Sequence, residues 1–164
     1  QIARALAGFR GVPHRLELIC ERAGVRYIND TTSTTPAAAI AALKALSLPA
    51  PGAAHTIILI AGGADKALDY EAMGRSVALR TKAVLLLDGS ATPKLDAMIR
   101  YAGGGPKIAG TFGSMAEVVQ RASEFAQPGD TVLLSPGCAS FGLFANEFDR
   151  GDQFRAVVQS LSET

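Results

Sequence analysis

The sequence predicts an α/β fold, an open, mostly parallel, Rossmann-like sheet of about six strands with helices on both faces. Short continuous apolar runs such as TIILIAGG (56–63) are typical of strands buried on both faces of a parallel sheet. These runs alternate with segments of helical spacing, which is the pattern of right-handed βαβ units. Two apolar-rich runs flank Ala23-Gly24 near the start, which predicts an antiparallel hairpin at one edge.

The elements follow in order from this pattern. The hairpin spans residues 14–30, and a helix over 36–46 has Thr35 as a plausible N-cap and Pro36 at its first position. Residues 49–54 (PAPGAA) are expected to form a loop. The remaining strands are expected at 56–63, 82–89, 107–110 and 130–137, and the remaining helices near 70–79, 92–101, 115–126 and 152–162.

The chain of 164 residues is expected to form one domain, because no linker, repeat or low-complexity segment divides residues 1–164. It begins with QIARALAGF, which has the spacing of an amphipathic helix and no initiator methionine. We therefore expect a domain cut from a longer protein, with part of any active site elsewhere.

Composition excludes several classes of partner. The apolar share of 48% and charged share of 19% are those of a globular protein. A net charge of +1 from scattered residues predicts no binding of nucleic acid or of an anionic membrane. No apolar run approaches the roughly 20 residues that span a bilayer. The two cysteines, Cys20 and Cys138, are far apart in sequence and are expected to be free thiols.

Several motifs are absent or incomplete. The chain has no GxxxxGK[ST] loop, no GxGxxG after a strand and no HExxH, and its two histidines lack metal-ligand spacing. GCASFG resembles the GxSxG elbow of serine hydrolases, but its serine stands one residue too late. No metal site is predicted.

Polar residues gather instead at the ends of predicted strands, where open α/β sheets bind ligands. Lys66 follows two glycines in IAGGADK, and it can either meet an anion or simply be solvated. Ser135 and Ser140 can donate hydrogen bonds to an anion, whereas Cys138 is predicted to be a packed apolar residue. The predicted strand-end segments are 29–30, 62–66, 88–89 and 135–140.

The stretches FRGVPHRLE, YINDTTSTTP, IAGGADK and LLSPGCASFGLFANEFDRGDQF, in this order, resemble one family. They are similar to the C-terminal domain of Mur ligases of bacterial peptidoglycan synthesis, and in particular to that of the D-glutamate-adding ligases. The resemblance covers essentially the whole chain. It implies that a UDP-binding domain and a central P-loop ATPase domain are absent from this chain.

The resemblance also implies a reaction. The complete ligase would use ATP, with Mg²⁺ bound mainly by the central domain, to convert UDP-N-acetylmuramoyl-L-alanine to an acyl phosphate. The nitrogen of D-glutamate would then attack, giving an amide, ADP and phosphate. A cytoplasmic, monomeric bacterial enzyme is implied, and the isolated domain would be inactive.

The resemblance assigns binding roles to six residues and catalytic roles to none. The nucleotide-binding residues would be His14, Arg15 and Asp30, and the glutamate-binding residues would be Thr34, Lys66 and Ser140. A lysine ammonium stays charged at neutral pH, which suits a carboxylate ligand. From the residues alone, His14 and Arg15 would be interpreted as a solvated pair at a strand entry.

Two positions depart from the family pattern and keep alternatives open. Thr32 stands where many members carry lysine, and Glu147 stands where relatives often place phenylalanine. These departures are compatible with a ligase that adds L-glutamate or another amino acid, as a related Mur-type or folylpolyglutamate ligase does. A further alternative is a nucleotide- or anion-binding module without catalysis.

Overall fold

The computed structural model describes residues 11–47 and 55–161 of the chain. Within them lies a sheet of six strands in the order β1-β2-β6-β3-β4-β5. β1 pairs with β2 antiparallel, and every other neighbouring pair is parallel. The strands are β1 Glu17–Arg22, β2 Val25–Asn29, β3 Ile57–Gly62, β4 Thr81–Leu87, β5 Ile108–Phe112 and β6 Thr131–Leu134. The predicted fold class is therefore confirmed.

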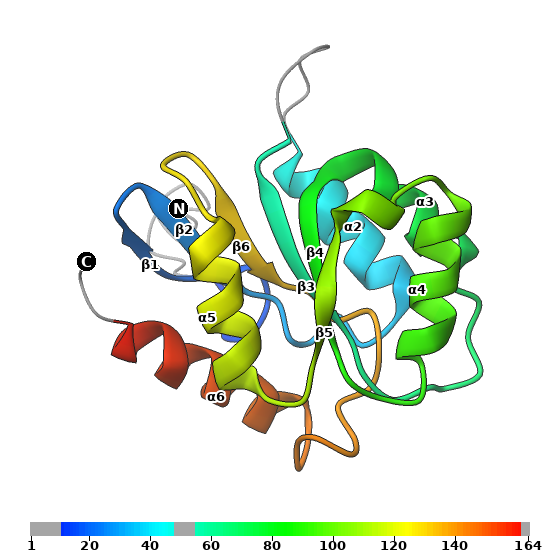
Figure 1. The fold of residues 1–164 in the computed structure, drawn as a ribbon. Coiled ribbons are helices and arrows are strands. Elements are labelled where there is room, and N and C mark those ends of the chain that lie inside the picture. The colour runs from blue at the N-terminus through cyan, green and yellow to red at the C-terminus, as the bar shows by residue number, and fades with distance from the viewer. Residues whose placement is uncertain (1–10, 48–54, 162–164) are drawn as a thin grey trace, which may run out of the picture.

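Helices cover both faces of the sheet (Figure 1). One apolar cluster joins α2, α3 and α4 to alternate strand residues such as Leu59 and Leu86. The other joins α5 and α6 to the residues between them, such as Ile58 and Leu85. Side chains alternate between the faces of a strand, so the continuous apolar runs fill both clusters. The helices are α2 Pro36–Leu46, α3 Glu71–Arg80, α4 Thr92–Tyr101, α5 Met115–Phe125 and α6 Glu147–Ser160, with a short 3₁₀ helix at Gly105–Lys107.

The local signals in the sequence explain several element boundaries. The Thr35 side chain accepts a hydrogen bond from the Ala38 N–H, as an N-cap does, and Pro36 is the first residue of α2. The hairpin turn has positive φ at both Ala23 (49°) and Gly24 (75°), the conformation that matches the twist of the flanking strands. The expected N-terminal helix and the expected loop at 49–54 lie outside the described residues.

The start of the last helix was predicted wrongly. α6 begins at Glu147, five residues before the predicted 152. Asn146 caps it by accepting hydrogen bonds from the N–H groups of Phe148 and Asp149, both at 2.9 Å. The helix continues through Gly151, although glycine is an unfavourable residue in a helix interior. Glycine is needed at this position because the neighbouring side chains leave no room for a Cβ atom.

Candidate functional site

The site lies where three neighbouring strands end. β2, β6 and β3 are adjacent in the sheet and parallel, so the segments that follow them meet at one edge. We name these segments the hydroxyl loop (residues 30–35), the serine loop (135–140) and the lysine loop (63–67). The sheet order thereby brings the hydroxyl loop next to the serine loop, although Asp30 and Ser135 are 105 positions apart in sequence.

Backbone hydrogen bonds join the three loops. Gly137 N donates to Ser33 O (2.8 Å), which links the serine loop to the hydroxyl loop. Ala64 and Ala139 exchange two bonds of 2.9 and 3.1 Å, which pair the lysine loop with the serine loop. Gly63 has φ of 138°, and a Cβ there would lie 2.4 Å from Ala139 O. This glycine is required because two backbones approach too closely for any side chain.

Two of the predicted glutamate-binding residues are in contact. Lys66 Nζ lies 3.5 Å from Thr34 Oγ1, although the residues are 32 positions apart. Lys66 is exposed and Thr34 is half-buried, so an ammonium and a hydroxyl face solvent together. Ser140, which is 4% exposed, directly follows Ala139 in the paired stretch. All three residues therefore lie on the joined loops, where they can offer hydrogen-bond donors to an anionic ligand.

Asp30 holds the hydroxyl loop in place. Its Oδ2 accepts hydrogen bonds from the hydroxyls of Ser33 (2.5 Å) and Ser135 (2.8 Å). Its Oδ1 accepts from the N–H of Leu16 (3.1 Å). The residue is only 3% exposed, so its carboxylate first serves to join β1, β2 and β6 at this edge. The bond with Ser135 joins residues 105 positions apart, so the spacing of the sequence could not reveal it.

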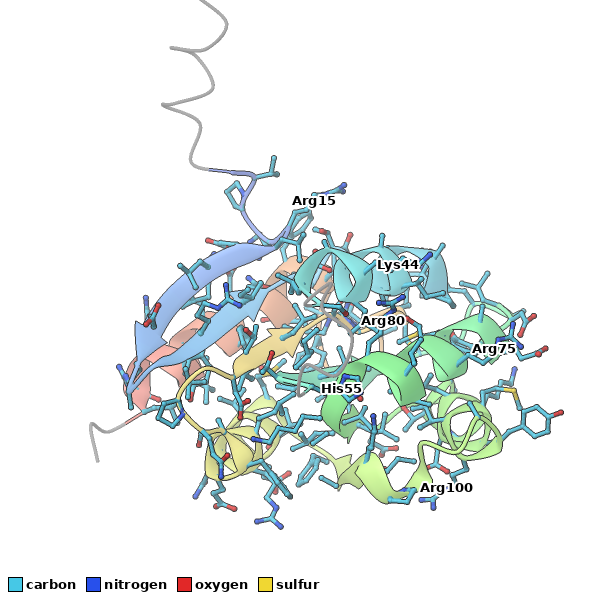
Figure 2. The ribbon with its side chains drawn as sticks, turned by 90° about the horizontal axis from the view of Figure 1, so that it is seen from above. Arg15, Lys44, His55, Arg75, Arg80 and Arg100 are labelled. Atoms are coloured by element: carbon cyan, nitrogen blue, oxygen red, sulfur yellow. The ribbon has the colours of Figure 1, made fainter. Side chains whose placement is uncertain are left out.

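A cavity of about 310 Å³ lies beside this carboxylate, large enough for part of a small ligand. Its lining includes a stripe of alanines on α2 at helical spacing, together with one cation and two hydroxyl side chains. Figure 2 shows Arg15 beside α2 and pointing away from the sheet, with Lys44 further along that helix. The lining residues are Arg15, Leu16, Asp30, Thr32, Ser33, Ala38, Ala41, Ala42 and Ala45.

His14 packs against α6 and is not one of the cavity-lining residues. Asn29 Nδ2 lies 3.1 Å from His14 Nδ1, and because an amide nitrogen only donates, that ring nitrogen accepts. His14 Nε2 lies 3.6 Å from Asp152 Oδ1, and the ring meets Phe148 edge-on at 5.5 Å. The two residues of the predicted nucleotide-binding pair are thus separated: Arg15 lines the cavity, whereas His14 packs against α6.

The backbone around Arg15 is held in an uncommon conformation. His14 has φ of 65° and Leu16 has φ of 44°, values that residues other than glycine rarely adopt. The His14 N–H donates to Glu17 Oε2 (2.9 Å), and Thr32 donates to His14 O through both its N–H and its hydroxyl. These bonds stabilise the turn that presents Arg15.

Arg150 on α6 is a site residue that sequence reasoning missed. It is fully buried, and its guanidinium donates to Thr31 Oγ1 (3.0 Å), Thr31 O (2.9 Å) and Cys138 O (3.2 Å). Burial lowers its pKa to about 10, so it remains a cation at neutral pH. The wrong helix start hid it, because residue 150 was expected before the helix.

Cys138 is a packed core residue, as predicted. It is 1% exposed within the cluster formed with α2, α3 and α4, and burial raises the pKa of its thiol. Tyr70, at the start of α3, is 2% exposed, and burial raises its pKa above the usual value. Neither group is ionised at neutral pH.

Metal-ligand clusters and membrane-spanning helices are both absent from residues 11–47 and 55–161. No cluster of three or more His, Cys, Asp or Glu side chains there could hold a metal ion. No helix in these segments is both long enough and apolar enough to cross a membrane.

Comparison with known proteins shows the family of this chain. The family described as "Mur ligase, glutamate ligase domain" matches residues 14–138, which include the hydroxyl, lysine and serine loops except Ala139 and Ser140. This chain belongs to the Mur ligase family. The UDP-N-acetylmuramoylalanine–D-glutamate ligase of Roseiflexus sp. (strain RS-1) is 51% identical over 98% of this chain. The corresponding enzyme of Symbiobacterium thermophilum is 41% identical over the same share.

Solved structures agree on the fold of this Mur ligase chain. The MurF ligase from Thermotoga maritima in complex with ADP superposes with a TM-score of 0.61 at 16% identity, over 96% of this chain and 36% of that one. A Mycobacterium tuberculosis folylpolyglutamate synthase complexed with ADP and AMPPCP gives a TM-score of 0.60 at 15% identity, over 94% and 34%. The chain spans about a third of the length of the Roseiflexus and Symbiobacterium ligases.

Proposed function

We propose that this chain is the C-terminal, amino-acid-binding domain of a ligase that adds D-glutamate to UDP-N-acetylmuramoyl-L-alanine. The observation that carries the proposal is the contact of Lys66 with Thr34 on joined loops at the carboxyl edge of the sheet. The names of the two relatives support the choice of amino acid. The remaining length of those relatives supports a UDP-binding domain and a P-loop domain outside this chain.

The proposed reaction forms an amide at the expense of ATP. ATP transfers its terminal phosphoryl group to the alanine carboxylate of the acceptor, and ADP leaves. The neutral nitrogen of D-glutamate attacks the resulting acyl phosphate and loses a proton, and the tetrahedral intermediate expels phosphate. In this scheme the present chain positions the amino acid, and orientation of that kind replaces a bimolecular encounter.

The glutamate carboxylates would be held by the three loops. The Lys66 ammonium and the Thr34 hydroxyl would bind one carboxylate, and the Ser140 hydroxyl would donate to the other. Lys66 and Thr34 already lie together, so little side-chain freedom is lost when the ligand binds. Capture of both carboxylates would favour glutamate over amino acids with an apolar side chain.

The nucleotide would lie along the cavity against α2. Arg15 is placed to meet a phosphate or ribose oxygen, and the alanine stripe offers a flat apolar wall. Asp30 borders the same cavity, whereas His14 would act by holding the turn that presents Arg15. Mg²⁺ would neutralise phosphate charge in the complete ligase, and we assign it no ligand in this chain. The proposed substrates imply a cytoplasmic enzyme.

The test uses the complete protein that contains this chain. Phosphate release is measured with ATP, Mg²⁺ and UDP-N-acetylmuramoyl-L-alanine, with D-glutamate and L-glutamate in parallel. We expect turnover with D-glutamate. Turnover with L-glutamate alone would assign a different amino acid, in line with the departures at Thr32 and Glu147. The absence of turnover with both would refute the proposal.

A matched pair of variants tests the site itself. Lys66→Met should raise the KM for D-glutamate by about ten- to a hundredfold, because a charge-assisted hydrogen bond is lost. Lys44→Met removes the same charge from the exposed last turn of α2 and should leave that KM unchanged. Equal effects of the two substitutions would contradict the assignment of Lys66.

A further inference from the structure

The buried guanidinium of Arg150 joins two loops that carry the proposed glutamate ligands. Its Nε and Nη2 donate to the side chain and carbonyl of Thr31, three residues before Thr34. Its Nη1 donates to the carbonyl of Cys138, two residues before Ser140. One rigid, planar group therefore contacts the hydroxyl loop and the serine loop at once.

This guanidinium makes no ion pair with any carboxylate of the described residues, although it is 0% exposed. All three acceptors are neutral oxygens. Burying a cation among neutral groups is unfavourable, so simple cross-linking of a core is a poor explanation for it. The geometry of the group offers a better explanation, because among side chains only a guanidinium presents several N–H donors in a fixed planar arrangement.

The contacts continue from Arg150 into α6. The Thr31 hydroxyl, which accepts from Arg150 Nε, donates onward to Glu147 O at 2.8 Å. Gly151, the next residue, allows the helix to approach Thr31, because a Cβ there would lie 2.6 Å from Thr31 Cγ2. The position of the first turns of α6 therefore fixes where the guanidinium meets both loops.

We infer that Arg150 is a positioning residue of the amino-acid site: its planar fork sets the separation between the loop of Thr34 and the loop of Ser140. The inference rests on the proposed function, because it assigns that residue an effect on glutamate binding. Arg150 acts through Thr31 and Cys138 and need not touch the substrate. Asp30 makes no hydrogen bond with Arg150 and is fixed by its own hydrogen bonds from Leu16, Ser33 and Ser135.

The kinetic test compares Arg150→Lys with Arg155→Lys in the complete ligase. Lysine keeps the charge but loses the fork, so we expect the KM for D-glutamate to rise at least about tenfold. The kcat and the KM for ATP should change by less than about threefold. A residue that merely stabilised the fold would lower the active fraction, and hence kcat, without changing the KM for glutamate.

Arg155 is a matched control on the same helix. It forms ion pairs with Glu17 (2.8 Å) and Asp152 (2.7 Å) and hydrogen-bonds to neither of the two joined loops. Arg155→Lys should therefore leave the KM for glutamate unchanged. If Arg150→Lys retains the wild-type KM, or if both variants raise it equally, the inference is wrong.

A second readout does not depend on turnover. Amide hydrogen exchange in segments 31–35 and 136–140 should be at least about tenfold faster in Arg150→Lys than in the wild type. The reason is that the hydrogen bond from Gly137 N–H to Ser33 O links these segments and weakens when their separation is no longer fixed. Unchanged exchange would overturn the inference even if the ligase proved to act on another substrate. Conversely, if the wild-type ligase shows no turnover with glutamate, only the proposed function is refuted.

If Arg150→Lys does not fold, Thr31→Val carries the same test. Valine keeps the shape of threonine but removes the oxygen that accepts from Arg150 Nε. We expect a rise of about three- to tenfold in the KM for glutamate, together with faster exchange in the same two segments. A folded Thr31→Val protein with wild-type values for both would overturn the inference.

Discussion

Gly151→Ala tests how closely α6 must approach the site. Alanine is favoured over glycine in a helix interior by about 1 kcal/mol, which would stabilise the protein if nothing else changed. The new Cβ, however, would lie 2.4 Å from His14 Nδ1 and 2.6 Å from Thr31 Cγ2. Overpacking of this kind costs about 1–3 kcal/mol.

The neighbours decide which effect is larger. The His14 ring is held by Asn29, Asp152 and Phe148, and the Thr31 hydroxyl is bonded on two sides. Neither group can move away cheaply, so the upper part of the overpacking range applies. We expect a net loss of about 1–2 kcal/mol in the free energy of unfolding, which for a chain of this size is a fall of about 2–8 °C in Tm.

Urea unfolding of the wild type and of Gly151→Ala measures this difference as a shift in midpoint at constant slope. Gly113→Ala is the control, because a Cβ there meets nothing within 4 Å and φ is not positive. The control should be neutral or stabilised by up to about 1 kcal/mol. If Gly151→Ala is as stable as this control, α6 does not need the close approach, and the argument fails.

Three further substitutions or treatments test the electrostatic description. Ser135→Ala should lower the free energy of unfolding by about 1–3 kcal/mol in urea, because the buried Asp30 carboxylate loses a donor. Partial burial raises the pKa of Glu17, but hydrogen bonds from a backbone N–H and Arg155 outweigh this and leave it below 4.5. The stabilisation is then present above about pH 4.5 and lost below it, so Glu17→Gln should flatten the acid dependence of the urea midpoint. Burial raises the pKa of the Cys138 thiol, so a thiol reagent at mild pH should modify it only after unfolding.

Much of the fold was accessible from local signals in the sequence. Thr35 and Pro36 define the start of α2, and Ala23-Gly24 defines the hairpin turn, because caps and turns depend on a few adjacent residues. Apolar runs located the buried strands, since burial on both faces leaves no room for polar positions. The start of α6 was missed because its cap, Asn146, lies in a stretch without apolar periodicity.

The sequence also indicated which loops carry the candidate site, but not which of their side chains line it and which hold the loops in place. Strand-end position and residue type singled out Lys66 and Ser140, and these preferences belong to any open parallel sheet. The division of His14 from Arg15 was not foreseeable, because it depends on positive φ at His14 and on packing against α6. Likewise, the contact of Asp30 with Ser135 joins residues 105 positions apart, at the ends of neighbouring strands.

By itself, then, the sequence determined the fold class, most element boundaries, and the loops that carry the candidate site, since these follow from short-range patterns. Only the tertiary structure placed Arg150 beneath Thr31 and Cys138, residues that lie 119 and 12 positions away along the chain. It also showed why Gly151 follows, since the helix must come close enough for the guanidinium to reach both loops. Contacts of this kind have no local signature, because they arise from the strand order of the sheet and the packing of one helix against it.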